Sequence, residues 1–256
     1  MNLVNRLFDL RGKVALVTGG SKGLGKAMAK GLADAGADIV ICSRHDEELR
    51  QALDEILAGK GNRGLAVVAD MTNRQDVDRL ARRALEEMGH VDILVNNAGS
   101  NIPQPVEEIR DADWDYLLEL NLTSIMRLTR ALVPQMKQRR WGRIIHISSI
   151  LGLISLPGRS AYSSTKFALH GLCRAQAAEL GAFGITVNCI APGPFLTELP
   201  ARLLTEEQKR KFTERTSLGR WGDPDELIGP VLLLASDAGS YITGQILVVD
   251  GGFTAR

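Results

Sequence analysis

The chain has too few cysteines for a disulfide framework and too little charge imbalance for a dedicated polyanion-binding protein. Three widely spaced cysteines occur in 256 residues, and 31 basic side chains stand against 30 acidic ones. Such cysteine usage is typical of a reducing compartment. A net charge of +1 gives no overall field that attracts nucleic acid or an acidic membrane. We therefore expect a cytoplasmic protein with neither nucleic acid nor membrane as a partner.

Long apolar runs are also missing, and we expect no targeting segment at the start of the chain. No run reaches the roughly 18 apolar residues of a membrane span. The start, MNLVNRLFDLRGK, has neither a long apolar core nor a small-residue cleavage site. The four histidines show no metal-ligand spacing, so we expect no metal site. A basic cluster, KQRRWGR at 137–143, could be a nucleic-acid patch, but basic residues also close helix C-termini, which we favour because the net charge is near zero.

What the chain does contain is an alternation of short β-branched runs and longer helical patterns. Most of the seven runs are continuously apolar, as expected for parallel strands covered on both faces. They are KVALVT (13–18), DIVICS (38–43), GLAVVA (64–69), DILVNN (92–97), RIIHIS (143–148), ITVNCI (185–190) and QILVVD (245–250). The alternation predicts an α/β fold, a doubly wound parallel sheet with helices on both faces. We expect one domain over 1–256, because α/β domains reach this size unsplit.

This pattern includes two helix-start signals and one long insertion. The segment 72–75 has capping-box spacing from Thr72, and Asp223 before Pro224 predicts an N-cap with proline at the first helical position. The stretch at about 194–222 is irregular around a charged segment. Long insertions in compact domains often act as lids or binding loops, so we predict a substrate lid there.

A glycine-rich turn follows the first run. TGGSKGLG places Gly19, Gly23 and Gly25 where a strand turns into a helix. Glycine permits the tight turn and lets a phosphate approach the backbone, and the helix N-terminus supplies free N–H groups with a partial positive charge. Glycines that only punctuate a turn would look the same. Their position after the first strand favours a dinucleotide pyrophosphate.

The end of the second run indicates which dinucleotide. A carboxylate there would hold the adenosine ribose hydroxyls and repel a 2′-phosphate. This chain has Ser43 and Arg44 instead, and Lys22 lies in the glycine-rich turn. Two cations with no acid at this place favour NADP(H) over NAD(H), although each cation could be a solvated surface charge.

Tyr162 and Lys166 form a pattern with catalytic meaning. In AYSSTK (161–166) they are four residues apart, which makes them neighbours on one helix face. A nearby ammonium favours the phenolate and lowers the tyrosine pKa. The pair therefore predicts an acid/base that works near neutral pH. Tyr-x-x-x-Lys also arises by chance, so this prediction depends on the rest of the chain.

Several short motifs in a fixed order supply that support. They are TGxxxGxG at 18–25, NNAG at 96–99, Asn121, Ser149, YxxxK at 162–166 and PG at 192–193. In order and spacing they resemble the short-chain dehydrogenase/reductase family over about residues 8–253. The resemblance implies a Rossmann-like, seven-stranded single domain. It also implies an oxidoreductase that acts on CH–OH groups.

The resemblance also implies a role for each of four catalytic residues. Tyr162 would exchange the proton of the substrate oxygen while hydride moves between nicotinamide and the carbonyl carbon. Lys166 would lower the pKa of Tyr162 and hydrogen-bond the nicotinamide ribose. Ser149 would hydrogen-bond the substrate oxygen. Asn121 would help to hold a water relay to Lys166.

The same resemblance places the cofactor along the strand ends. The segment 97–99 would approach the adenosine side, the pair at 70–71 would flank the adenine, and the stretch from 192 to 197 would border the nicotinamide amide and the diphosphate. The full set of expected cofactor contacts is Gly19, Ser21, Lys22, Gly23, Leu24, Gly25, Ser43, Arg44, Asp70, Met71, Asn97, Ala98, Gly99, Tyr162, Lys166, Pro192, Gly193, Phe195 and Thr197.

The motifs leave the substrate open between two subgroups that the chain resembles. One is the 3-oxoacyl-(acyl carrier protein) reductases, which would need a basic docking surface near the site. Arg139 and Arg140 could supply it, but Phe183 stands where that subgroup often has a basic residue. The other is sugar-acid dehydrogenases of the gluconate 5-dehydrogenase type, which LFDLRGKVALVTGG and GRWGDPDEL resemble. We favour a sugar acid or small ketone, with Asn101 and Arg159 as polar groups that could meet it.

Two further expectations concern the protein as a whole. A catalytically silent NADPH-binding regulatory protein is a third possibility, since folds of this kind can lose catalysis. The presence of all four catalytic residues disfavours it. Family members usually form tetramers, and the resemblance implies a D2 homotetramer in which helices at about 112–138 and 161–181 pack against those of a partner.

Overall fold

The computed structural model describes residues 2–197 and 205–255 and contains a seven-stranded sheet. Every neighbouring pair is parallel, in the order β3-β2-β1-β4-β5-β6-β7. The strands are β1 (Val14–Thr18), β2 (Asp38–Ser43), β3 (Gly64–Val68), β4 (Ile93–Asn96), β5 (Gly142–Ile147), β6 (Ile185–Pro192) and β7 (Ile246–Val249). The predicted fold class is confirmed. Each predicted run agrees with its strand to within two residues at either end.

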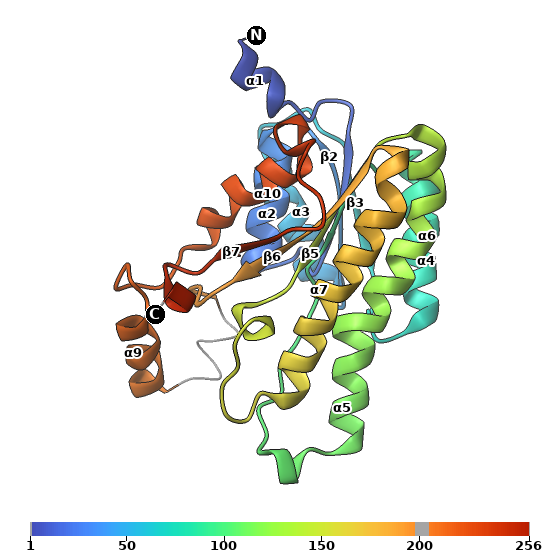
Figure 1. Ribbon diagram of the computed structural model, residues 1–256. Coiled ribbons are helices and arrows are strands. Elements are labelled where there is room, and N and C mark those ends of the chain that lie inside the picture. Colours follow the sequence, from blue (N-terminus) through green and yellow to red (C-terminus); the bar gives the residue numbers. More distant parts are fainter. Residues whose placement is uncertain (1, 198–204, 256) are drawn as a thin grey trace.

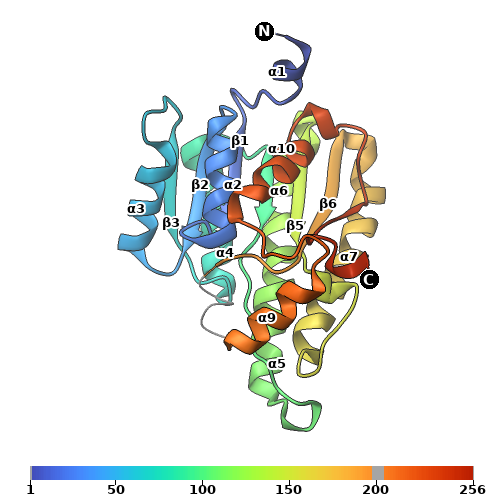
Figure 2. The same cartoon turned by 90° about the vertical axis from the view of Figure 1, so that its left-hand side faces the viewer.

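Helices cover both faces of this sheet, as Figures 1 and 2 show. The face formed with α4, α6 and α7 encloses one apolar cluster, and the face formed with α2, α3 and α10 encloses another. The helices are α1 (Leu3–Leu7), α2 (Gly23–Asp34), α3 (Asp46–Leu57), α4 (Arg74–Met88), α5 (Asp111–Leu118), α6 (Ser124–Arg139), α7 (Ser160–Leu180), α9 (Glu206–Arg215) and α10 (Ile228–Ala235). None of the described helices combines the length and the apolar character needed to cross a membrane.

The two-sided cover explains why the central strand β1 is apolar throughout, whereas the edge strand β3 buries only alternate residues. All five residues of β1 are buried. Successive side chains of a strand point to opposite faces, so Leu16 lies in the cluster with α4 and α6 while Val17 lies in the cluster with α2 and α3. A strand covered on one face only would need a polar residue at every second position.

The structure corrects one of the two predicted helix starts. The N-cap of α4 is Asn73, whose side chain accepts hydrogen bonds from the backbone N–H groups of Gln75 and Asp76. Thr72 is not the cap, because its own N–H and hydroxyl donate to the Asp70 carboxylate. The other prediction is confirmed: Asp223 caps a short 3-10 turn, Pro224–Leu227, which leads into α10.

Parallel pairing brings the motif-bearing loops to one edge of the sheet. The carboxyl ends of β1, β4, β5 and β6 share this edge, and the glycine-rich turn, NNAG, Ser149 and Pro192–Gly193 stand at or just after them. Helices α5 and α9 extend beyond this edge, while α1 lies at the opposite end of the molecule (Figure 1).

Candidate active site

A cavity of about 820 Å³ opens at the carboxyl edge of the sheet. All the residues predicted to contact a cofactor line it, together with Ser149. Residues that the sequence did not single out for this site also line it, namely Cys42, His45, Glu48, Ala69, Tyr116, Leu120, Ile147 and Ser148. The structure therefore brings the predicted site together in one place, while the role of each residue stays a prediction.

The glycine-rich turn is fixed by steric and hydrogen-bond constraints. Gly19 has φ +65°, and a Cβ on Gly25 would lie 2.2 Å from the Gly19 carbonyl oxygen. A side chain at position 25 would collide with the Gly19 carbonyl, so only glycine fits there. The N-cap residue of α2, Lys22, makes no side-chain capping hydrogen bond, and the first turn contains no acidic residue. The amides of this helix start are therefore suited to an anion such as a pyrophosphate.

Asn97 is a scaffold residue as well as part of the cavity wall. Its side-chain amide donates to the carbonyl oxygens of Thr18 and Gly19, at 2.8 and 3.3 Å. The Thr18 hydroxyl accepts in return from the backbone N–H groups of Asn97 and Ala98. These bonds tie the end of β4 to the glycine-rich turn, so this amide has a structural function that the resemblance did not specify.

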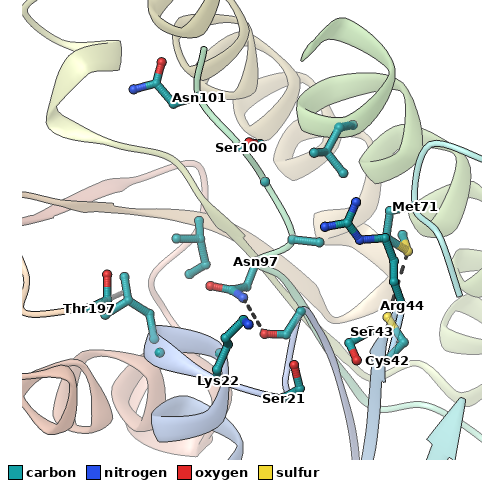
Figure 3. Close-up of a pocket in the computed structure, with 18 of the residues that line it drawn as sticks. Ser21, Lys22, Cys42, Ser43, Arg44, Met71, Asn97, Ser100, Asn101 and Thr197 are labelled. Atoms are coloured by element: carbon teal, nitrogen blue, oxygen red, sulfur yellow. Dashed lines mark hydrogen bonds between the residues drawn. The ribbon is translucent and has the colours of Figure 1, made fainter. Parts of the chain in front are cut away.

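Arg44 lies where a 2′-phosphate was expected. Figure 3 shows its guanidinium extending into the pocket beyond Ser43. The side chain is exposed, and it forms no ion pair within residues 2–197 and 205–255. An exposed, permanently charged fork of N–H donors is the group that binds phosphate in two places at once.

The prediction that no acid lies at this place is wrong. Glu48 in the first turn of α3 lines the same cavity. Its carboxylate accepts from the Ser21 hydroxyl at 2.5 Å and from the Lys22 ammonium at 3.0 Å. Glu48 does not belong to the end of β2. The signal for its contact in the sequence is DEEL (46–49), where a helix start turns acidic side chains back toward the glycine-rich turn.

Lys166 is buried beneath Tyr162. Its Nζ donates to the Ile147 carbonyl at 2.8 Å and lies 5.6 Å from the centroid of the Tyr162 ring. Burial lowers the pKa of Lys166 to about 8. Burial also raises the pKa of Tyr162 above its usual value, against the opposing effects of a hydrogen bond with Ser149 and the charge of Arg159. The predicted lowering of the Tyr162 pKa by Lys166 is therefore wrong in this structure, because desolvation dominates.

The structure distinguishes Ser149 from the neighbouring Ser148. The Ser149 hydroxyl accepts from the Leu151 N–H at 3.1 Å and shares a hydrogen bond with Tyr162. The Ser148 hydroxyl donates to the Lys166 carbonyl at 3.0 Å and pairs with His170 Nε2 at 2.7 Å. Ser149 is thus the serine beside the phenol, whereas Ser148 supports the backbone of α7.

Asn121 lies behind the cavity in a π-helical turn (Glu119–Thr123) between α5 and α6. It is fully buried, and its side chain exchanges two hydrogen bonds with the backbone of Ser100, at 3.0 and 2.9 Å. Its amide also donates to the Thr165 hydroxyl at 3.2 Å. A Cβ on Gly99 would lie 3.1 Å from Asn121 Oδ1 and 3.4 Å from Lys166 Nζ. Asn121 therefore fixes the loop after β4 against α7, close to Lys166.

Two polar groups have no partner within the described part of the chain: Asn101, which lines the cavity, and Arg159, which precedes Tyr162 at the start of α7 and does not line it. Asn101 Oδ1 and Arg159 Nη1 are both buried atoms without a hydrogen bond. Arg159 is the N-cap of α7, one turn before Tyr162, and burial lowers its pKa. Figure 3 shows Ser100 and Asn101 on the far side of the pocket from Ser21 and Lys22. An unpartnered buried polar atom is unusual in a native structure, and Asn101, which lines the cavity, is placed to meet a ligand.

The basic cluster at 137–143 lies away from this cavity. Arg139 pairs with Asp92 at 3.4 Å, and Arg140 donates to the Ala182 carbonyl at 3.0 Å. Both precede the amino end of β5, which is the opposite edge of the sheet from the site. Arg139 and Arg140 therefore cannot form the carrier-protein docking surface near the site for which they were candidates.

The predicted lid at about 194–222 includes residues 198–204, which lie outside the described residues. In the described part, α9 packs through Phe212 onto Trp221, with ring centroids 5.8 Å apart. A second cavity of about 430 Å³ lies between α9 and the segment 195–197.

Metal and disulfide chemistry find no support in the described residues. In those ranges no group of three or more His, Cys, Asp and Glu side chains is placed to hold a metal ion. Cys42, Cys173 and Cys189 are all free and buried.

The chain is similar to known proteins over nearly its whole length. The sequence profile described as short chain dehydrogenase matches residues 13–208. The chain is 38% identical over 252 residues to gluconate 5-dehydrogenase of Gluconobacter oxydans, with 97% of each protein covered. It is 38% identical over 244 residues to a 3-oxoacyl-[acyl-carrier-protein] reductase of Vibrio cholerae, covering 95% of this chain and 98% of that protein. A gluconate 5-dehydrogenase structure from Burkholderia cenocepacia, in complex with NADP and tartrate, superposes with a TM-score of 0.91 at 35% identity and 99% coverage of both chains.

Proposed function

The chain belongs to the short-chain dehydrogenase family, and on that premise we propose that it is an NADP(H)-dependent oxidoreductase. It would transfer hydride between the nicotinamide and a carbonyl or secondary-alcohol substrate. The observation that carries this proposal is the convergence of Ser149, Tyr162 and Lys166 with the glycine-rich turn on one cavity. A proton donor, its hydrogen-bond partner and a phosphate cradle are the groups that carbonyl reduction by a dinucleotide requires.

The residues present fit an NADP(H) cofactor. The open helix start at Gly23 suits the diphosphate, and Arg44 with Lys22 suits the 2′-phosphate. When bound, the cofactor supplies or accepts the hydride. The neighbour from Burkholderia cenocepacia, solved with NADP, supports the same assignment.

Tyr162 would donate a proton to the substrate oxygen. Its raised pKa keeps the phenol protonated at neutral pH, which is the state that carbonyl reduction requires. Ser149, hydrogen-bonded to the phenol, would hold the same oxygen and stabilise its developing charge. Lys166 would replace the proton that Tyr162 gives up, and Asn121 would hold the relay that leads to Lys166. Both residues lie against Gly99 at the floor of the site.

For the substrate we favour a sugar acid or a small keto acid. Arg159 Nη1 is a buried donor without a partner in the described ranges, one helical turn from Tyr162, and it could bind a carboxylate. Asn101 Oδ1, likewise unpartnered there, could accept from a substrate hydroxyl. The similarity to gluconate 5-dehydrogenase supports this class, as does the neighbour solved with the hydroxy acid tartrate.

A 3-oxoacyl thioester on a carrier protein is the second candidate, because the similarity to the Vibrio cholerae reductase is equally high. Arg139 and Arg140 lie at the wrong edge of the sheet to dock the carrier at the site. Any carrier would therefore have to meet another surface.

One assay separates these candidates. NADPH consumption is followed with 5-ketogluconate and with an acetoacetyl thioester side by side. We expect turnover of the keto acid, and we expect Arg159→Ala to raise its KM while Arg139→Ala, which removes a charge at the far edge, changes nothing. Turnover of the thioester alone would select the second candidate. NADPH binding without turnover of any carbonyl would identify a binding protein.

We further propose that residues 1–256 form one dinucleotide-binding domain that assembles as a cytoplasmic homotetramer, with a substrate lid at about 194–222. Phe167 on α7 is 68% exposed, which is unusual for a large aromatic side chain and suits a helix face that packs against a partner. Val248 in the edge strand β7 is also exposed and suits a second contact.

A further inference from the structure

Glu48 and Asp70 are acidic side chains that line the cavity, and Glu48 is the one whose carboxylate contacts the glycine-rich turn, whereas Asp70 binds Thr72. The Glu48 carboxylate holds both side chains at the tip of the glycine-rich turn, accepting from Ser21 Oγ at 2.5 Å and from Lys22 Nζ at 3.0 Å. Ser21 is buried, whereas Glu48 is only half-buried and faces the cavity. The carboxylate thus lies at the border between the protein and the space that a ligand would fill.

A hydroxyl and an ammonium are the donors that a phosphate group uses. Arg44 lines the same end of the cavity, with Ser43 and His45. An anion recognised by Arg44 would meet Ser21 and Lys22 already engaged by a carboxylate. Because Ser21 and Lys22 also hold the pKa of Glu48 below its usual range, that carboxylate carries its negative charge at neutral pH.

The contact between Glu48 and Lys22 is not needed merely to join α2 and α3. A second ion pair, between Lys26 on α2 and Glu55 on α3 at 2.5 Å, joins the same two helices. Glu55 does not line the cavity. Of these two pairs between α3 and the start of α2, the Lys26–Glu55 pair lies outside the cavity wall and the Lys22–Glu48 pair lies within it.

We propose that Glu48 determines cofactor specificity by acting as an internal competitor of the cofactor 2′-phosphate, an inference that rests on the proposed function. In the free protein its carboxylate occupies Ser21 and Lys22. NADP(H) must displace it to use these donors. NAD(H), which lacks the 2′-phosphate, leaves it in place and offers it ribose hydroxyls as donors. Glu48 thus weakens the preference for NADP(H) that Arg44 creates.

Two adenosine fragments that differ by the 2′-phosphate test this role without any need for turnover. The dissociation constants of 2′,5′-ADP and 5′-AMP are measured by calorimetry for the wild-type chain, Glu48→Gln and Glu55→Gln. We expect Glu48→Gln to tighten 2′,5′-ADP about fivefold, the size of one partly exposed charge pair, and to leave 5′-AMP unchanged or weaker. Glu48→Lys should tighten 2′,5′-ADP further, and Glu55→Gln should change neither.

The outcomes separate this inference from the proposed cofactor. An unchanged ratio of the two constants in Glu48→Gln contradicts the role of Glu48, whichever cofactor the chain prefers. An equal shift in Glu55→Gln does the same, because it would mark a general effect of charge. A wild-type chain that does not prefer 2′,5′-ADP contradicts the proposed NADP(H) dependence instead. Thermal denaturation midpoints show whether each variant is folded, and Glu48→Lys provides the test if Glu48→Gln is not.

Discussion

The ammonium of Lys166 lies 5.6 Å from the centroid of the Tyr162 ring and donates a 2.8 Å hydrogen bond to the carbonyl of Ile147. This bond joins the first turns of α7 to the end of β5. The ammonium is therefore held in place by the sheet itself rather than by solvent. Its position below the phenol is set before any substrate arrives, which is the preorganisation that acid/base catalysis benefits from.

Removing the phenol hydroxyl should stop catalysis and spare cofactor binding. We expect Tyr162→Phe to lower kcat by about 10²- to 10⁴-fold, the usual contribution of a positioned proton donor. The ring and its packing remain, so the dissociation constant for NADPH should change little. Steady-state kinetics and NADPH titration measure the two effects. A variant that keeps most of its activity would show that another group delivers the proton.

Burial of the Lys166 charge predicts a pH-dependent change in stability. Burial lowers the pKa of Lys166 from its ordinary 10.5 to about 8. Between these values the unfolded chain binds the proton and the folded chain does not, so the free energy of unfolding rises with pH there. Below pH 8 both states carry the charge, and the folded state bears the full desolvation penalty.

Lys166→Met removes that penalty and also the hydrogen bond to the Ile147 carbonyl, so the test is how its stability relative to wild type changes with pH. This relative stability should be greatest at pH 7 and should fall as the pH rises from 8 toward 10. Urea denaturation of both proteins at pH 7.0, 8.5 and 9.5 measures the difference, in which the titration of other groups largely cancels. A constant difference would mean that the lysine is buried without a lowered pKa.

Asn121 should matter for stability as well as for activity. Asn121→Ala leaves the part-buried N–H and carbonyl groups of Ser100 without their partners, and each unpaired group that water does not reach costs about 1–3 kcal/mol. We expect the free energy of unfolding to fall by about 2–5 kcal/mol. Thr165→Val, which removes only the third partner of this amide, is the control and should lose much less. Equal losses in the two variants would contradict the bracing role.

Arg44 should carry much of the discrimination between the two nicotinamide cofactors. We expect Arg44→Ala to lower the preference for NADPH over NADH by tenfold or more, which is about 1.4 kcal/mol of lost interaction with the 2′-phosphate. The ratio of kcat/KM with the two cofactors measures it. If that ratio stays the same, the 2′-phosphate is recognised by Lys22 and Ser43 without Arg44.

The exposed face of α7 predicts the state of assembly. Light scattering at micromolar concentration should give four times the 27.8-kDa chain mass. Phe167→Glu places a charge at the centre of the proposed contact and should yield smaller species that are still folded. Leu3→Glu changes another exposed apolar residue, on α1 away from α7, and should leave the assembly intact. A monomeric wild-type mass would refute the tetramer.

The fold was predictable because its determinants are local and repeated. Most strands are short apolar runs, and burial on both faces removes the need for alternation in a central strand, as β1 shows with five buried residues of five. The boundary of α4 was less predictable. Thr72 and Asn73 can both cap a helix, and the choice fell to Asn73 because Asp70 binds Thr72. Such competition between neighbours for one partner is decided by geometry that sequence spacing does not contain.

The site was predictable to the extent that strand ends position it. Residues at the carboxyl ends of parallel strands must converge, so Gly19, Asn97, Ser149 and Pro192 meet around one cavity. Glu48 was missed because it reaches the glycine-rich turn from α3, across 26 or 27 residues of chain. The pKa of Tyr162 was predicted with the wrong sign, because spacing supplies the neighbouring charge but not the extent of burial.

The sequence by itself determined the order of strands and helices along the chain, the family and the spacing that sets Tyr162 beside Lys166, since these follow from periodicity and from motifs a few residues long. Only the tertiary structure decided which groups are desolvated and which distant charges touch. It buried Lys166, left Arg159 without a partner in the described ranges, and set Glu48 against Lys22. The physical reason is that desolvation and ion pairing depend on the three-dimensional surroundings of a group, to which segments far apart in the chain contribute together.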